Sequence, residues 1–158
     1  MRILVFSDSH ANTCTCAAII DKLPAADMII HAGDHYADAQ KLQDMYPKLD
    51  FRYVAGNCDS PLYPQEMTFN TGGKNFFLSH GHSYGVKYES NYRTFAEKAK
   101  AEHADIGIFG HTHIFFCKQE DGLLLMNPGS IKYGGSFGII EIEDGKVFAD
   151  ICFSNLWL

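Results

Sequence analysis

The chain has 158 residues and a net charge of −6 at pH 7, and it is 46% hydrophobic and 20% charged. These values are ordinary for a soluble globular protein and exclude a disordered tail, a coiled coil and a collagen-like chain. Proteins that hold a long nucleic-acid backbone by charge are usually basic, so the acidic balance disfavours a nucleic-acid partner. The length predicts one domain, residues 1–158, with a sizeable core.

The N-terminal apolar run is too short for a signal peptide, because it reaches Asp8 at once. No stretch approaches the ~20 apolar residues of a membrane span. The five cysteines are odd in number and follow no metal-binding pattern. We therefore expect reduced thiols in a cytoplasmic protein with no membrane contact.

Short apolar runs predict five strands that are buried on both faces, at residues 3–6, 28–30, 51–54, 75–78 and 106–109. Helices are predicted between several of them, at residues 13–23, 37–46 and 89–103. Asn12 or Thr13 would cap the first helix, and Pro24 would end it. Alternation of strand and helix predicts βαβ units and a largely parallel sheet.

The last third of the chain changes character. Four strands joined by short turns are predicted at residues 114–118, 123–126, 137–142 and 147–153, which together indicate an antiparallel meander. The expected fold class is α/β, with two mixed β-sheets packed together and flanked by helices. The apolar end, residues 153–158, would form either an edge of the core or a contact in a homo-oligomer.

Polar residues gather where five predicted strands end, which is where open α/β sheets place their ligands. The clusters are Asp8-Ser9-His10, Gly33-Asp34-His35, Gly56-Asn57-Cys58-Asp59, Ser79-His80-Gly81-His82 and Gly110-His111-Thr112-His113. Alternate residues of extended backbone point the same way, so Asp-x-His and His-x-His can each aim two ligands at one ion. A single cluster of this kind is usually a turn, but five after five buried strands indicate a shared site.

Seven side chains in these clusters can donate to a metal: Asp8, His10, Asp34, Asn57, His80, His111 and His113. They are too many for one four-coordinate zinc ion and include no thiolate pair. Imidazole, carboxylate and amide ligands suit Mn, Fe, Ni or Zn. Seven donors with one shared carboxylate suit two ions about 3.5–4 Å apart, the separation that enzymes use for attack on phosphorus.

The five clusters, in this order and spacing, resemble the calcineurin-like metallophosphoesterase superfamily. The form Gly56-Asn57-Cys58-Asp59 is similar to its short bacterial and archaeal phosphodiesterase branch. The resemblance runs from Arg2 to about Ser130, where residues 127–130 are similar to a late turn of that branch. It implies a four-layer fold and hydrolysis of a small phosphodiester by a hydroxide held between two divalent metals, with Mn first and Ni, Fe or Zn as alternatives.

Carried over position by position, the resemblance implies a role for each matching residue. Asp8, His10 and His113 would hold one metal, Asn57, His80 and His111 would hold the other, and Asp34 would bridge both. The catalytic set would be His10, Asp34, Asn57, Cys58 and Asp59. Asp59 and His82 would orient ligands, and His35 and Ser130 could contact substrate.

The chain departs from the superfamily pattern at two positions. Many members have a second acid three residues after the bridging Asp, whereas here that position is Ala37 and Asp38 comes one later. Members often have His after the metal-binding Asn, and here it is Cys58. Because a thiol is a poor general acid near neutral pH, we expect activity biased toward diesters, or toward esters with acidic leaving groups.

Other classes of function compete with a phosphodiesterase. The fold also resembles a eukaryotic trafficking subunit that serves as a protein-interaction scaffold, but that subunit's bridging carboxylate is degraded and Asp34 is present here. A nuclease of the same superfamily is disfavoured by the charge of −6 and the lack of an appended nucleic-acid domain.

Several residues keep two interpretations at this stage. Tyr84, Tyr88 and Tyr92 could flank a pocket, although such a stripe at helical spacing is more often core. The turn at residues 127–130 could offer hydrogen bonds to phosphate or only connect strands. His31 lies in an apolar run, which favours a core histidine.

Overall fold

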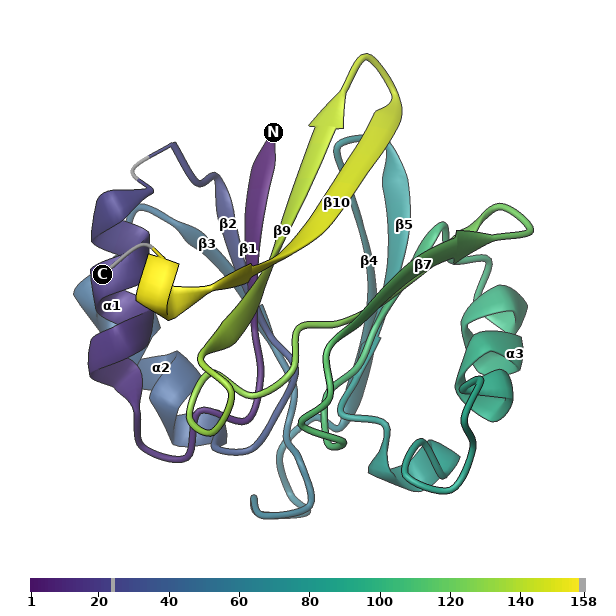
Figure 1. The fold of residues 1–158 in the computed structure, drawn as a ribbon, viewed down its shortest axis with the longest axis horizontal. Coiled ribbons are helices and arrows are strands. Elements are labelled where there is room, and N and C mark those ends of the chain that lie inside the picture. Colours follow the sequence, from purple (N-terminus) through teal and green to yellow (C-terminus); the bar gives the residue numbers. More distant parts are fainter. Residues whose placement is uncertain (24, 157–158) are drawn as a thin grey trace.

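Two five-stranded sheets pack face to face in the computed structural model, which describes residues 1–23 and 25–156 (Figure 1). In these described residues three α-helices lie outside the sheets: α1 (Thr13–Lys22), α2 (Tyr36–Met45) and α3 (Arg93–Ala101). Pro24, Trp157 and Leu158, which the sequence predictions include, lie outside the described residues. The result is the four-layer α/β arrangement that the sequence predicts.

The first sheet has the strand order β10-β9-β1-β2-β3. Its strands are β1 (Arg2–Phe6), β2 (Met28–His31), β3 (Asp50–Tyr53), β9 (Ser136–Glu143) and β10 (Lys146–Phe153). The first three strands run parallel, with Leu4 opposite Ile29, whereas β9 runs antiparallel to both β1 and β10. The helices α1 and α2 cover the outer face of this sheet (Figure 1).

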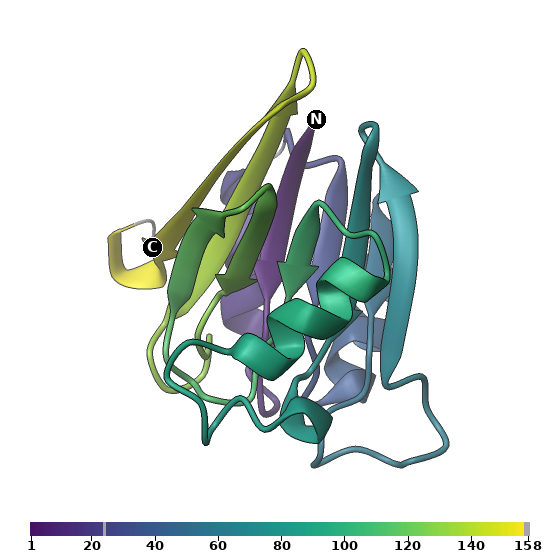
Figure 2. The ribbon, with the colours of Figure 1, turned by 90° about the vertical axis from the view of Figure 1, so that its right-hand side faces the viewer.

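The second sheet has the strand order β4-β5-β6-β8-β7. Its strands are β4 (Glu66–Thr71), β5 (Lys74–Ser79), β6 (Ile106–Ile108), β7 (Phe116–Glu120) and β8 (Leu123–Asn127). The three inner strands are parallel, and the edge strands β4 and β7 are antiparallel to their neighbours. Figure 2 shows α3 crossing the outer face of this sheet.

The all-apolar sequence of β1 is explained by the layers on its two sides. Ile3 and Val5 belong to the core between the sheets, whereas Leu4 and Phe6 pack into the core under α1. All four side chains are fully buried. Burying each such side chain contributes roughly 1.5–3 kcal/mol, so both cores hold β1 in place.

The predicted antiparallel meander is wrong. β7 and β8 form a hairpin in the second sheet, and β9 and β10 form another in the first sheet. The chain changes sheets through residues 128–135. The reason is that β8 is buried at all five positions and pairs in parallel with β6, so it lies inside its sheet and β9 pairs with β1 instead.

Some boundaries also differ from the sequence predictions. The prediction missed β4, an edge strand that alternates exposed and half-buried residues and so lacks a continuous apolar run. The third helix begins at Arg93 instead of residue 89, and the strand expected at residue 114 begins at Phe116. Ile114 and Phe115 remain exposed in the preceding loop.

Two findings bear on the surroundings of the protein. None of the helices in the described residues has both the length and the apolar character to cross a membrane. All five cysteines are free thiols.

Candidate metal centre

The loops that follow β1, β2, β3, β5 and β6 meet at one end of the sandwich, the lower end in Figure 1. They bring three groups of donor atoms within 4.8 Å of one another: Asp8, His10 and His113; Asp8, Asp34 and His80; and His10, Asp34 and Cys58. The groups share Asp8, His10 and Asp34, so they form one centre. Residues from five loops thus surround a single small volume.

Asp8 lies fully buried directly after β1. One carboxylate oxygen, Oδ2, accepts hydrogen bonds from Ser7 Oγ at 2.6 Å and from the backbone N–H of His111 at 3.1 Å. The other, Oδ1, has no hydrogen-bond donor among the described residues and lies 3.1 Å from His113 Nε2. Burial raises the pKa of Asp8. A buried carboxylate oxygen in this state is costly unless a cation faces it.

Asp34 occupies the middle of the centre. Its Oδ1 accepts a hydrogen bond from the backbone N–H of Cys58 at 3.0 Å, and its Oδ2 lies 3.4 Å from His80 Nε2 and 3.9 Å from His10 Nε2. Burial alone would raise the pKa of Asp34, but His80 and the Cys58 N–H outweigh it and hold that pKa well below its usual range. Asp34 is therefore a carboxylate at neutral pH.

His80 is oriented by the backbone of the loop that follows β2 in the other sheet. Its Nδ1 lies 2.7 Å from the carbonyl oxygen of Ala32, which accepts a hydrogen bond only from a protonated nitrogen. The neutral ring therefore presents the Nε2 lone pair to the centre, the arrangement found in metal-bound histidines. Burial disfavours the charged ring, but Asp34 and Asp8 outweigh it and raise the pKa of His80. The centre thus attracts positive charge.

The backbone at this centre is strained. Positive φ angles, which L side chains rarely adopt, occur at five of the seven candidate ligands: Asp8, His10, Asp34, His111 and His113. Left-handed backbone costs roughly 1–2 kcal/mol per residue. Because such strain persists where function requires a particular geometry, its concentration here marks a functional site.

Two glycines allow the loops to approach each other closely. A Cβ atom at Gly56 would lie 2.0 Å from Asp34 Oδ1, and one at Gly110 would lie 2.0 Å from Ser7 Oγ. Both distances are far below contact, so any side chain would push the loops apart. Gly56 and Gly110 are thus part of how the donors come together.

A buried chain of hydrogen bonds joins the loop after β1 to α2. The backbone N–H of Gly33 donates to His31 Nδ1 at 3.3 Å, so the ring proton lies on Nε2 and points to Ser9 Oγ at 2.9 Å. Ser9 Oγ donates to Asp38 Oδ2 at 2.7 Å, and the backbone N–H of Ala11 donates to the same oxygen at 2.8 Å. Burial lowers the pKa of His31 to about 4, which keeps its ring neutral.

Asp59 joins its own loop, which follows β3, to the start of α2. Its Oδ1 accepts a hydrogen bond from the backbone N–H of Tyr36 at 2.8 Å, and its Oδ2 accepts one from Gly56 at 2.8 Å. Both oxygens are therefore used to tie the loop after β3 to the start of α2. This geometry fits a positioning role for Asp59.

Asn57 and Cys58 are exposed at the rim of the centre. The Asn57 amide lies 3.6 Å from Cys58 Sγ. Although Cys58 is exposed overall, partial desolvation of its thiol and the nearby Asp34 carboxylate raise the pKa of Cys58 to about 11, so the thiol is protonated at neutral pH.

The remaining histidines surround the ligands. The His82 ring centroid lies 5.6 Å from that of His80 and 6.1 Å from that of His111, and the His35 centroid lies 5.1 Å from that of His10. Burial, followed by the charge of His80, lowers the pKa of His82 and lowers that of His111 to about 4. Both rings therefore favour the neutral form, which is the form in which His111 could bind a metal.

The turn at residues 127–130 supports the candidate metal centre through hydrogen bonds. Ser130 Oγ is buried, donates to the backbone oxygen of Asp8 at 2.9 Å and accepts from the backbone N–H of Tyr133 at 3.0 Å. The Asn127 amide donates to the backbone oxygen of Gly110 at 2.8 Å. These hydrogen bonds hold two ligand loops, and the Ser130 hydroxyl faces the protein interior.

Sequence reasoning missed Tyr133. Its ring stacks on that of His113, with centroids 5.3 Å apart, and lies 5.4 Å from the His10 ring. The side chain is 68% exposed, so it forms part of the rim. No motif signals this position, because it lies in the segment that crosses between the sheets.

These donors fit divalent cations. Among the described residues, Asp8 Oδ1, His10 Nε2 and His80 Nε2 are buried without a hydrogen-bond partner. Carboxylate and imidazole donors suit Mn, Fe, Ni or Zn. Asp34, which faces His10 and His80, contributes a further charge.

Comparison with known proteins gives a consistent family match. The profile of the calcineurin-like phosphoesterase superfamily domain matches residues 1–145. A probable metallophosphoesterase of Bacillus subtilis, YsnB, is 32% identical over 152 residues, which cover 91% of this chain and 86% of that protein. A probable metallophosphoesterase of Mycoplasma pneumoniae is 34% identical over 133 residues, which cover 83% of this chain and 79% of that protein.

Solved structures share the fold. A predicted phosphoesterase from Streptococcus pneumoniae superposes with a TM-score of 0.80 and 25% identity, covering 98% of this chain and 90% of that one. A protein described as a novel archaeal phosphodiesterase has a TM-score of 0.70 and 21% identity, covering 96% and 100%. Vps29 of Entamoeba histolytica, solved with Zn²⁺, has a TM-score of 0.71 and 21% identity, covering 98% and 100%.

Proposed function

The chain belongs to the calcineurin-like phosphoesterase superfamily, and from this premise we propose that it is a metal-dependent phosphodiesterase that acts on a small phosphodiester at a pair of divalent cations. One observation carries the proposal. Buried donor atoms of Asp8, His10 and His80 lack hydrogen-bond partners among the described residues, and they face the interior of one centre. Groups in this state are retained where a cation satisfies them.

The proposed ligand assignment divides the donors into two sets with one shared member. Asp8, His10 and His113 would hold one cation, and Asn57, His80 and His111 would hold the other, with Asp34 between them. Two carboxylates and two divalent cations leave the centre with a net charge of about +2, which favours an anionic substrate. When bound, the cations would activate water as a nucleophile and stabilise charge that develops on the phosphoryl oxygens.

The surrounding residues would keep this geometry rigid. Ala32 fixes the ring of His80, and Asp59 ties the loop that carries Asn57 to the start of α2. Preorganised ligands of this kind lower the cost of binding the cations and the transition state. Manganese is the first metal to test, and Ni, Fe and Zn are the alternatives.

The direct test is hydrolysis of bis-p-nitrophenyl phosphate by metal-stripped protein, with and without each of these ions. We expect turnover to return with Mn²⁺, and calorimetry to show two ions bound per chain. Turnover that persists after complete removal of metal would contradict the proposal.

A non-catalytic scaffold is the second candidate, supported by the fold shared with Vps29. Against it stands the donor set, because all seven candidate ligands are present in this chain. A protein that binds two ions yet turns over no diester would favour the scaffold.

A further inference from the structure

A groove of about 540 Å³ runs beside the candidate metal centre, between the 86–92 segment and the loop that carries Thr112 and Ile114. Thr112, in one wall, lies between the candidate ligands His111 and His113 in the sequence, and the charge of Lys87, in the other wall, acts on His111. The groove therefore adjoins the centre. The 86–92 segment, which forms the other wall, comes after β5 and the short 3₁₀ helix His82–Tyr84 in the chain. A group esterified to a phosphate at the centre could therefore enter the groove.

The floor of the groove is buried, and two large apolar side chains in its walls are exposed. Val86 and Tyr92 are 2% and 8% exposed, and the Tyr92 ring packs 4.7 Å from that of Phe109. In contrast, Tyr88 is 91% exposed and Ile114 is 64% exposed. Large apolar side chains that line one groove indicate a surface for an apolar or aromatic ligand.

Polar groups lie around this apolar surface. Lys87, Glu89 and Ser90 line the groove together with Thr112. Both Glu89 carboxylate oxygens accept hydrogen bonds from Thr94 at the start of α3, which holds the Glu89 side chain in place. An exposed aromatic ring, that of Tyr88, with donors and acceptors near it matches a nucleobase, which has a flat π-face and a polar rim.

We propose that this groove binds the nucleoside of a nucleoside phosphodiester, with the base against Tyr88 and Ile114 while the phosphate lies at the metal centre. The inference rests on the proposed phosphodiesterase function and specifies its substrate class. It also gives Tyr88 and Tyr92 different roles, since Tyr92 belongs to the core under the groove and Tyr88 is exposed in its wall.

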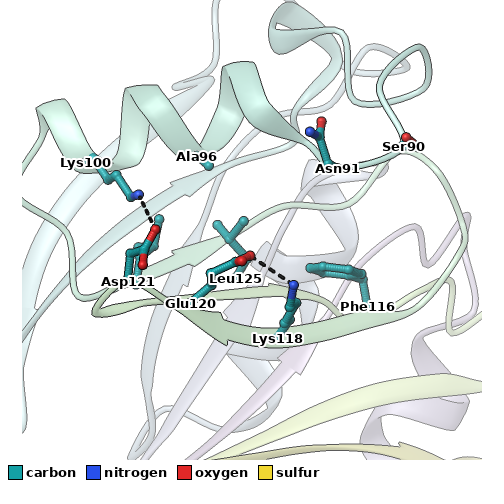
Figure 3. Close-up of a pocket in the computed structure, with 10 residues that line it drawn as sticks. Ser90, Asn91, Ala96, Lys100, Phe116, Lys118, Glu120, Asp121 and Leu125 are labelled. Atoms are coloured by element: carbon teal, nitrogen blue, oxygen red, sulfur yellow. Dashed lines mark hydrogen bonds and ion pairs between the residues drawn. The ribbon is translucent and has the colours of Figure 1, made fainter.

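An adjoining hollow does not offer the same site. This second cavity, about 240 Å³, lies between α3 and the β7–β8 hairpin and shares Ser90 with the groove (Figure 3). Lys100 points to Asp121 at 3.9 Å, and Lys118 pairs with Glu120 at 2.9 Å. Its cations are thus engaged by acids, and none of its described lining residues is a sequence neighbour of a candidate ligand.

Three diesters with one shared leaving group test the proposal: the p-nitrophenyl phosphate esters of thymidine (through its 5′ oxygen), phenol and methanol. With Mn²⁺ present, we expect kcat/KM to fall in the order thymidine, phenyl, methyl. The thymidine ester should exceed the methyl ester at least about 10-fold, the scale of one base-stacking contact. Equal values for thymidine and phenyl would overturn the nucleoside assignment.

Two variants locate the effect. Tyr88→Ala should lower kcat/KM for the thymidine ester about 10-fold more than for the methyl ester. Phe148→Ala is the matched control, because Phe148 is an exposed aromatic residue on β10, at 55% exposure, outside the groove. It should leave the ratio between the two esters unchanged. Equal ratios in both variants would contradict the groove.

Calorimetry supplies a readout that does not depend on turnover. Thymidine 5′-monophosphate should bind the Mn²⁺-loaded protein about 10-fold more tightly than inorganic phosphate, and Tyr88→Ala should close that gap. Equal hydrolysis of all three esters, with the nucleotide bound no more tightly than phosphate, would overturn nucleoside binding in the groove. It would not contradict the proposed phosphodiesterase function. Absence of turnover with every ester would overturn the phosphodiesterase function, while calorimetry would still test nucleoside binding in the groove.

Discussion

The inner and outer halves of the candidate metal centre differ in burial and in support. Asp8, Asp34 and His80 are at most 3% exposed, and each has a backbone hydrogen-bond partner. Asn57 and His113 are exposed, and the exposed ring of Tyr133 stacks on that of His113. The inner half is therefore built as part of the fold. The outer half is open to a ligand.

This difference predicts where a substitution acts. A change in the inner half removes an ionic or hydrogen-bonding group whose desolvation is already part of the cost of folding. Such a change should therefore affect metal binding directly. A change in the outer half should act mainly on substrate and leaving group. The following experiments are ordered by the size of the effect expected.

Asp34→Asn should have the largest effect. The amide keeps the size of the side chain and can still accept the Cys58 N–H, but it removes the negative charge that faces both His10 and His80. Losing a charge shared by two cations should cost several kcal/mol, about 10⁴-fold in rate. Metal analysis and bis-p-nitrophenyl phosphate hydrolysis measure the result. Full activity with two bound ions would refute the shared role of Asp34.

The leaving group tests the outer half. Cys58 is exposed where many superfamily members have a histidine, and its thiol is a poor proton donor at neutral pH. A missing general acid costs about 10²–10⁴-fold, and the cost is largest for a basic alkoxide. Pairs of diesters that differ only in an aryl or alkyl leaving group should differ in kcat/KM by about 10³-fold. Comparable turnover would show that another group supplies the proton.

The parts of the fold that could be predicted from sequence are those with a one-dimensional signal. Strands β1, β2, β5 and β6 are continuous apolar runs because helices cover one face and the other sheet covers the second face. β4 has one face toward solvent, and its alternating residues resemble a loop as much as a strand. The crossing of residues 128–135 between sheets depends on the pairing of β8 with β6, which no local pattern encodes.

The candidate centre shows the same limit. The clusters after buried strands predict which loops supply donors, and the structure brings Asp8, His10, Asp34, His80 and His113 together. The hydrogen bonds that support the ligand loops had no such local pattern in the sequence. Ser9 meets Asp38 across 29 positions, and Ser130 reaches Asp8 across 122, because the loops are joined in space by buried hydrogen bonds.

Acid should weaken the support of the inner half through His31. Burial lowers its pKa in the folded protein to about 4, from an ordinary value of 6.5 in the unfolded chain. Between these values the unfolded chain binds a proton that the folded chain does not, so the free energy of unfolding falls as the pH falls. The stabilisation is complete above pH 6.5, and about 3 kcal/mol is lost by pH 4.

Urea unfolding of the wild type and His31→Gln at pH 7, 5.5 and 4 measures this contribution. Other groups titrate equally in both proteins, so the difference between their stabilities isolates His31. We expect the wild type to lose about 3 kcal/mol more than the variant across this window. Curves that stay parallel would show that His31 is protonated in the folded protein.

The smallest effect is expected at Asp38, which accepts hydrogen bonds from Ser9 and Ala11 on either side of His10. Within the described part of the chain, Asp38 has no hydrogen bond or ion pair to a candidate ligand. Asp38→Asn should loosen this loop and weaken metal binding about 10-fold, at the low end of what partners of ligands contribute. Asp105→Asn is the matched control. Asp105 lies directly before β6, at the end of the sheet away from the metal centre, and accepts a hydrogen bond from the backbone N–H of Asn75. If both variants lower thermal stability and only Asp38→Asn weakens Mn²⁺ binding by calorimetry, the carboxylate positions the ligand loop. Equal metal affinities would reduce Asp38 to a structural residue and confine the preorganised half to Asp8, Asp34 and His80.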